Sequence, residues 1–220
     1  MAVVPPCGSD YIANYLAHNK ISFYPFRVRR LYLDSTFTLN QYRKGSPPEW
    51  QKAIDILEDR IRGRFLEPIS QIEGYTYAGF AILALDCLLI ETLQQFREGV
   101  HETPQGQSKA FFVRFLTETS FGTHFSEEMA KVFYDQIRCG ILHQAEVKGS
   151  SRILIREDIP LVKYTDDRKG LVTNRKLFHQ QLVREFEAYI AELREPSNQE
   201  LRVRFKKKMD HICRISEEIC

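Results

Sequence analysis

Residues 75–97 read YTYAGFAILALDCLLIETLQQFR and form the most apolar stretch of the chain. Their apolar side chains are dense enough to cover most of the circumference of a helix, which is typical of a helix buried on all sides. The longest apolar run within them, residues 78–93, is interrupted by Asp86 and Glu91 and is shorter than the roughly twenty residues that span a bilayer. We therefore expect the central helix of a bundle, and neither a membrane anchor nor a membrane partner.

The two carboxylates in this helix need an explanation. A carboxylate buried among apolar side chains must be paired with a cation or protonated, because an isolated charge is costly to remove from water. Asp86 and Glu91 can line the one wet strip of the helix, or they can lie beside an active site. The sequence leaves both alternatives open.

Five further segments have the apolar periodicity of helices. In the first of them apolar residues such as Ile54 and Leu57 recur at three- and four-residue steps, and Pro68 should kink or end that helix. Ser126 and Asn174 are typical N-cap residues for two of the others. The expected helices cover residues 46–68, 108–118, 126–144, 174–194 and 201–219.

The pattern between residues 150 and 174 is different from that of the helices. Three short β-prone runs alternate in polarity there, and Pro160 and the turn formers of residues 166–170 separate them. Such a pattern predicts a β-hairpin or three short strands. The fold class expected is therefore mainly α, a helical bundle with a small inserted β-hairpin or three-stranded β segment. We expect one domain over residues 1–220, with residues 1–45 as an irregular N-terminal extension.

Composition limits the classes of function. The net charge of +2, from 31 basic and 29 acidic residues, is too small for long-range attraction to nucleic acid. No Gly-rich phosphate loop is present, which argues against nucleotide kinases and dehydrogenases, and we expect no cofactor. Five scattered cysteines without a Cys-x-x-Cys pair favour a reducing, cytoplasmic location over a disulfide framework or a zinc site. We accordingly expect no bound metal.

One motif suggests chemistry. Residues 133–144 read FYDQIRCGILHQ, in which Arg138 is followed after four intervening residues by His143. On an amphipathic helix behind a very apolar one, this pair resembles the signature of the HEPN superfamily. Many members of that superfamily are metal-independent ribonucleases of toxin–antitoxin and antiviral systems. The resemblance implies a homodimer in which two such pairs share one cleft, RNA as substrate, and an antitoxin-like protein partner.

The two residue types suit RNA cleavage by the 2′-hydroxyl of the RNA itself. Imidazole, with an ordinary pKa of about 6.5, can act as the general acid or base, so His143 takes that role. A guanidinium is permanently charged and binds two phosphate oxygens, so Arg138 would stabilise the transition state. Asp135 could orient this guanidinium, and Gln144 and Glu146 could line the cleft.

The spacing of the pair raises a geometric question. Residues five apart on an ideal helix lie about 140° apart around its axis, so Arg138 and His143 would not share a face. Gly140 between them could let the helix end or distort early. Alternatively, the two side chains act from opposite subunits across a dimer interface.

Two other functions remain open. Cys139 occupies a position where the HEPN family often has a polar residue such as Asn, which favours a non-catalytic module that binds RNA, a nucleotide or a protein. A plain helical scaffold would leave Arg138 and His143 apart and exposed. A C-terminal basic run could contact RNA or simply be a solvated face; it comprises Arg202, Arg204, Lys206, Lys207 and Lys208.

Overall fold

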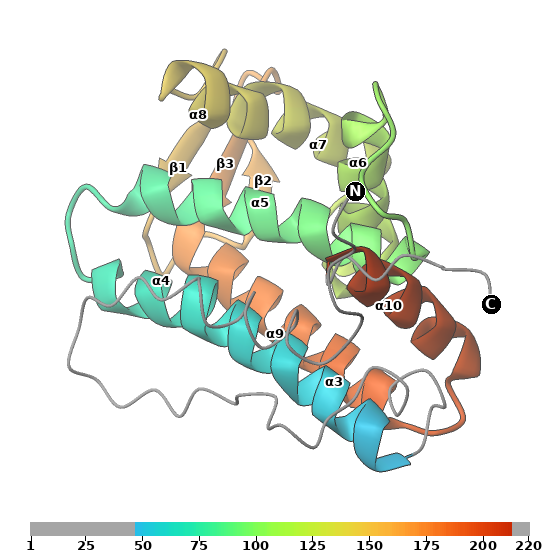
Figure 1. Ribbon diagram of the computed structural model, residues 1–220. Coiled ribbons are helices and arrows are strands. Elements are labelled where there is room, and N and C mark those ends of the chain that lie inside the picture. The colour runs from blue at the N-terminus through green and yellow to red at the C-terminus, as the bar shows by residue number, and fades with distance from the viewer. Residues whose placement is uncertain (1–46, 213–220) are drawn as a thin grey trace, which may run out of the picture.

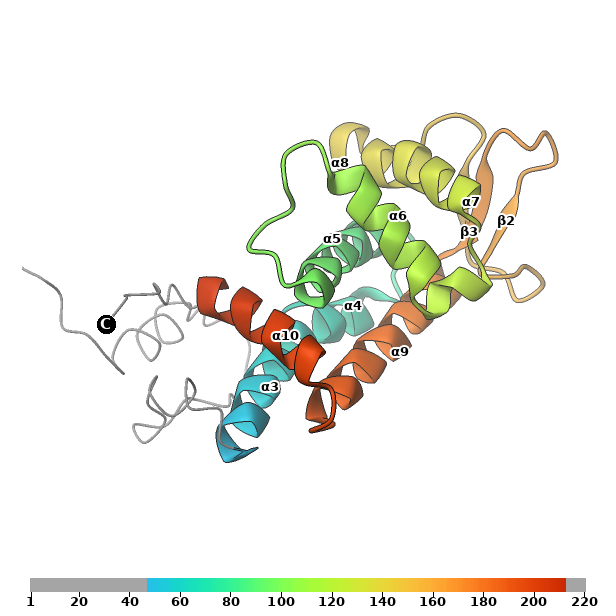
Figure 2. The same cartoon turned by 90° about the vertical axis from the view of Figure 1, so that its right-hand side faces the viewer.

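The computed structural model describes residues 47–212, and their side chains from Trp50 onward (Figure 1). The expected N-terminal extension, residues 1–45, lies outside the described residues. The chain folds as a mainly α structure with one small sheet, which confirms the predicted fold class. Figures 1 and 2 show α5 crossing the middle of the molecule, with the sheet and α8 on one side of it and α3 and α9 on the other.

The first helical segment continues past the proline that was expected to kink or end it. It comprises α3 (Pro47–Ile61), the π-helical turn η1 (Arg62–Leu66) and α4 (Glu67–Ile72). Pro68 lies in the first turn of α4, where a missing backbone N–H is tolerated. The chain therefore stays helical to Ile72, and the irregular turn precedes the proline.

The central helix is α5 (Gly79–Glu98), which starts four residues later than predicted because residues 75–78 form turns. It packs against α6, α9 and α10. Within the described residues it is the one helix with the length and apolarity to cross a membrane, and half of its most apolar window is buried inside the protein. Gly99 ends it in a left-handed conformation, and a Cβ there would lie 2.7 Å from Cα of Arg204 on α10.

A second layer follows α5 along the chain. It comprises α6 (Ser108–Glu118), the 3-10 turn η2 (Ser120–Thr123), and a rod made of α7 (Glu127–Val132), η3 (Phe133–Arg138) and α8 (Cys139–Gln144). Ser126 caps the rod as predicted, because its side chain accepts a hydrogen bond from the backbone N–H of Met129. Phe133 attaches the rod to the bundle by stacking on Phe112 of α6 and Phe178 of α9, with ring centroids 5.9 and 5.0 Å away.

The β segment forms three short strands, as one of the two alternatives predicted. They are β1 (Arg152–Leu154), β2 (Val162–Tyr164) and β3 (Leu171–Asn174), in the order β1-β3-β2. β2 pairs antiparallel with β3, whereas β1 pairs parallel with β3. The segment is therefore a hairpin with an added parallel strand, and it leads directly into the next helix.

Two helices complete the described chain. α9 (Arg175–Arg194) begins at the predicted cap, since the Asn174 side chain accepts a hydrogen bond from the backbone N–H of Leu177. α10 (Gln199–Ile212) begins two residues before its predicted start and lies across α5. Both cover the apolar faces of α3 and α5, so the core is shared by helices from the two ends of the described chain.

Candidate functional site

The rod of α7, η3 and α8 carries the Arg138–His143 motif, and we call it the motif helix. Its middle part, η3, is a π-helical turn directly before α8, which contains His143. In η3 the backbone N–H of Cys139 bonds to the carbonyl of Tyr134, five residues back, which defines a π turn. The distortion predicted near Gly140 therefore lies one turn earlier. Gly140 has a different role: a Cβ there would lie 2.4 Å from the backbone oxygen of Glu146, where the chain folds back against the helix.

Arg138, the last residue of the π turn, points into the protein. Its Nη2 lies 3.0 Å from Oε2 of Glu91 on α5 and 3.4 Å from Oγ of Ser108 on α6. The Ser108 hydroxyl also donates to the same Glu91 oxygen, over 3.1 Å. The guanidinium lies over the Tyr134 ring, 5.1 Å from its centroid. Three elements thus hold one guanidinium, which we call the Arg138 cluster: Arg138, Glu91, Ser108 and Tyr134.

The cluster keeps Arg138 charged and partly accessible. Burial by itself would lower the pKa of Arg138, but the interactions with Tyr134, Glu91 and Cys139 outweigh burial and raise it. The Arg138 side chain keeps 16% of its surface exposed. Its Nε is buried and has no hydrogen-bond partner within the described residues. A fixed cation of this kind is suited to bind a phosphate oxygen at the edge of the cluster.

His143 lies in the last turn of α8 and is exposed. Ala145 ends the helix two residues later in a left-handed conformation, with φ of 53°. Among the described residues no hydrogen bond or ion pair joins His143 to Arg138. Within one chain, the arginine therefore faces the bundle while the histidine faces solvent.

The residues expected to support the pair have other surroundings. Asp135 forms an ion pair with Lys109 of α6 at 2.5 Å, so the carboxylate that orients Arg138 is Glu91. Gln144 and Glu146 are exposed, and the Glu146 carboxylate accepts from the neighbouring Val147 N–H. Cys139 is half-buried and has a free thiol.

The basic run of α10 is not one exposed face. Arg202 is buried, donates to the carbonyls of Leu193 and Arg194, and so caps the end of α9. Lys208 is also buried, donates to Gln95 and to the His101 carbonyl, and has a pKa lowered by burial. The three others differ: Arg204 pairs with Glu200, Lys206 pairs with Asp210, and Lys207 is exposed.

A second polar cluster contains Asp86, which the sequence singled out, and two residues of α9 that it did not. Asp86 is fully buried, and its Oδ1 lies 2.8 Å from Nδ1 of His179 on α9. Arg175, one turn before His179, is also buried and donates to the Glu73 carbonyl over 3.4 Å. The apolar context of Asp86 signalled that it needs a partner, but nothing local pointed to His179, which is 93 positions away.

Among residues 47–212, no group of three or more His, Cys, Asp or Glu side chains is placed to hold a metal ion. Comparison of the chain with protein-family models, with curated protein sequences and with solved structures finds no match.

Proposed function

We propose that this protein is a metal-independent RNA endonuclease of HEPN type that acts as a homodimer. The observation that supports this most is the Arg138 cluster. A guanidinium held by Glu91 and Ser108 needs little reorganisation to meet a phosphate, and such preorganised charge stabilises a transition state effectively. In this proposal Arg138 stabilises the extra negative charge on the phosphate oxygens in the transition state.

In this proposal His143 moves the proton. Its exposed position at the end of α8 lets RNA approach the imidazole. As base, the imidazole takes the proton of the 2′-hydroxyl, whose oxygen attacks the neighbouring phosphorus. The bond from phosphorus to the 5′-oxygen of the next nucleotide breaks, and that oxygen takes a proton from water. The products therefore carry a 2′,3′-cyclic phosphate and a 5′-hydroxyl, and the imidazolium returns its proton to solvent.

The directions of the two side chains support the proposal of a homodimer. Arg138 and His143 diverge within one chain, so a site that uses both needs His143 of a second copy. Leu142, beside the histidine, is an exposed apolar side chain that would favour self-association of α8. The proposed cleft therefore contains the Arg138 cluster of one protomer and the α8 end of its partner.

Single substitutions test the chemistry. His143→Ala should reduce cleavage of single-stranded RNA by about a hundred- to ten-thousandfold, and Arg138→Ala by a similar factor. Cleavage should persist in EDTA and leave cyclic phosphate ends. A control is Arg204→Ala with His211→Ala, an arginine and a histidine of α10 that should leave kcat unchanged. Cleavage that survives both motif substitutions would contradict the proposal.

Mixing the two inactive variants tests the composite site. A 1:1 mixture of Arg138→Ala and His143→Ala proteins should recover about a quarter of wild-type activity, because half of the dimers are mixed and each contains one intact site. Light scattering at micromolar concentration should show a dimer. A strict monomer, or a mixture that stays inactive although mixed dimers form, would exclude the site shared between subunits.

A non-catalytic module is the second candidate, and one observation favours it. Glu91 already neutralises Arg138, so the cluster can serve as a structural ion pair, and Cys139 stands where the HEPN family often has a polar residue. RNA, nucleotide or protein binding without cleavage, equal in wild type and His143→Ala, would support this alternative. An antitoxin-like partner and a role in toxin–antitoxin or antiviral defence rest on the HEPN resemblance alone.

A further inference from the structure

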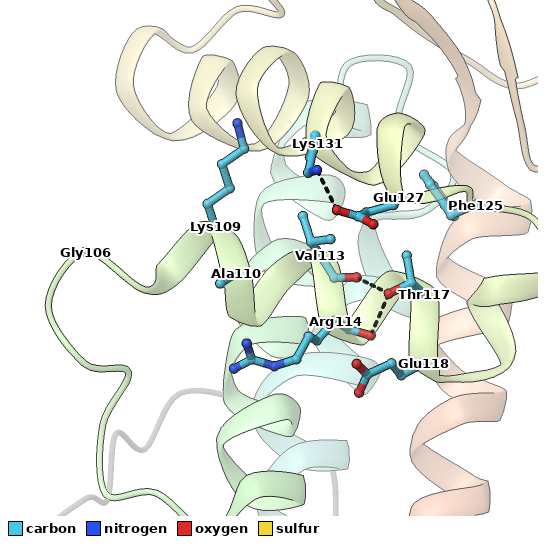
Figure 3. Close-up of a pocket in the computed structure, with 10 residues that line it drawn as sticks. All are labelled: Gly106, Lys109, Ala110, Val113, Arg114, Thr117, Glu118, Phe125, Glu127 and Lys131. Carbon is cyan, nitrogen blue, oxygen red and sulfur yellow. Dashed lines mark hydrogen bonds and ion pairs between the residues drawn. The ribbon is translucent and has the colours of Figure 1, made fainter.

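A charged groove lies between α6 and the motif helix (Figure 3). Its volume is about 650 Å³, within the range of pockets that hold one small ligand. Ala110, Val113 and Phe125 provide an apolar lining. In Figure 3, Lys109 rises from α6 toward the motif helix, while Lys131 and Glu127 point from α7 toward α6. The groove thus combines an apolar lining with charged walls.

Two of the three cations that line this groove are held by weak, exposed ion pairs, whereas the third, Arg114, pairs with Glu98 and lies over the Phe111 ring. Lys109 pairs with Asp135 and Lys131 with Glu127, and the two lysine side chains are 43% and 50% exposed. Hydrogen bonding to Lys131 lowers the pKa of Glu127, so that carboxylate is charged at neutral pH. Exposed pairs of this kind contribute little to stability. A phosphate can therefore replace either carboxylate at small cost.

The Lys109 end of the groove is next to the Arg138 cluster along the chain. Lys109 directly follows Ser108, whose hydroxyl contacts both Glu91 and Arg138. Asp135, the partner of Lys109, lies three residues before Arg138 on the motif helix. A strand that passes from Lys131 on α7 to Lys109 on α6 would therefore be directed toward the Arg138 guanidinium.

We propose that this groove binds the sugar-phosphate backbone of single-stranded RNA next to the phosphate that Arg138 contacts, an inference that rests on the proposed function. Lys109 and Lys131 each take one phosphate in exchange for a carboxylate. The apolar lining receives a ribose or a base edge.

Two double variants test the groove by binding. In a His143→Ala background that keeps RNA intact, Lys109→Ala with Lys131→Ala should weaken binding of a fluorescent single-stranded RNA. It should also reduce the salt slope of log Kd by about 1.4, at roughly 0.7 per lost contact. The matched control, Lys176→Ala with Arg184→Ala, removes the same charge from exposed α9 residues and should change neither value. An unchanged slope in the groove variant overturns the proposal.

The exchange of carboxylate for phosphate has its own signature. Glu127→Gln removes the competitor of the phosphate at Lys131, so it should tighten RNA binding several-fold, whereas a merely structural pair predicts no gain. Weaker or unchanged binding would contradict the exchange. The same variant should keep the thermal unfolding midpoint of the wild type, which shows that the fold is intact.

Kinetics separate this proposal from the proposed function. With His143 intact, the groove variant should raise KM and leave kcat nearly unchanged, because uniform binding is lost. If KM is unchanged and cleavage still depends on Arg138, the groove proposal is refuted and the nuclease proposal stands. If RNA binding depends on the two lysines but no cleavage depends on Arg138, the groove proposal stands and the nuclease proposal is refuted. If the affinity for RNA does not depend on the two lysines but the affinity for a peptide partner does, the groove is a protein-binding site instead.

Discussion

Two carboxylates of α5 hold two basic side chains in different surroundings. Asp86 is fully buried and pairs with His179 of α9, with Arg175 one turn away. Glu91 pairs with Arg138, and both side chains keep about a fifth of their surface exposed. The Asp86 carboxylate is closed to ligands, although its partner His179 keeps 11% of its side chain exposed, and this pair joins α9 to α5. The Glu91 carboxylate is 21% exposed, so the second pair is open to solvent. The two pairs therefore differ mainly in the exposure of their carboxylates.

The largest effect on stability should come from breaking the buried pair. Asp86→Ala leaves His179 and Arg175 buried without their carboxylate, which typically costs about 3–5 kcal/mol of the free energy of unfolding. Urea unfolding followed by circular dichroism measures it. Asp86→Asn keeps the size and an acceptor and should cost less. A loss below about 1 kcal/mol for Asp86→Ala would show that this pair does not hold the helices together.

Breaking the open pair should act on catalysis more than on stability. Glu91→Gln frees the guanidinium, so RNA should bind more tightly and KM should fall. The guanidinium also loses its fixed position, and kcat should fall by up to about a hundredfold. Stability should drop by about 1–2 kcal/mol, less than for Asp86→Ala. Glu91→Asp, which keeps the charge, should restore part of kcat. A change in stability alone would make Glu91 a structural residue.

The smallest expected effect is on the pH dependence of stability. The contribution of the buried Asp86 should change with pH in the direction opposite to that of an ordinary paired carboxylate. Burial raises the pKa of Asp86, although His179 and Arg175 act in the opposite direction. Its contribution to stability is therefore present at low pH and lost as pH rises through the raised pKa. The free energy of unfolding of wild type minus that of Asp86→Asn should therefore fall as pH rises above the ordinary aspartate value of 3.8.

Glu58 provides the control of opposite sign. Burial alone would raise its pKa, but hydrogen bonds from Arg62 and Arg194 outweigh burial and lower it. Its contribution is present above the ordinary pKa and lost as pH falls through the lowered value. The same difference for Glu58→Gln should therefore rise with pH. Curves of equal sign for the two variants would contradict this account.

Local signals predicted most of the fold. Ser126 and Asn174 cap the helices that they were expected to cap, because a cap depends on a hydrogen bond to a backbone N–H three residues away. The bounds of α6 and α9 agree with the prediction. Pro68 does not end the helix, one of the two outcomes predicted for it, since the chain continues as α4 to Ile72. The π turn before it has no clear mark in the sequence.

Composition and periodicity by themselves determined that this chain forms a helical bundle around residues 75–97, with short strands between residues 150 and 174. They also indicated that Asp86 and Glu91, if buried, would need partners. Only the tertiary structure decided that these partners are His179 and Arg138, and that Asp135 faces Lys109. The partners in these two pairs are 93 and 47 positions apart in the sequence. They meet because the helices pack together, and no local spacing in the sequence relates them.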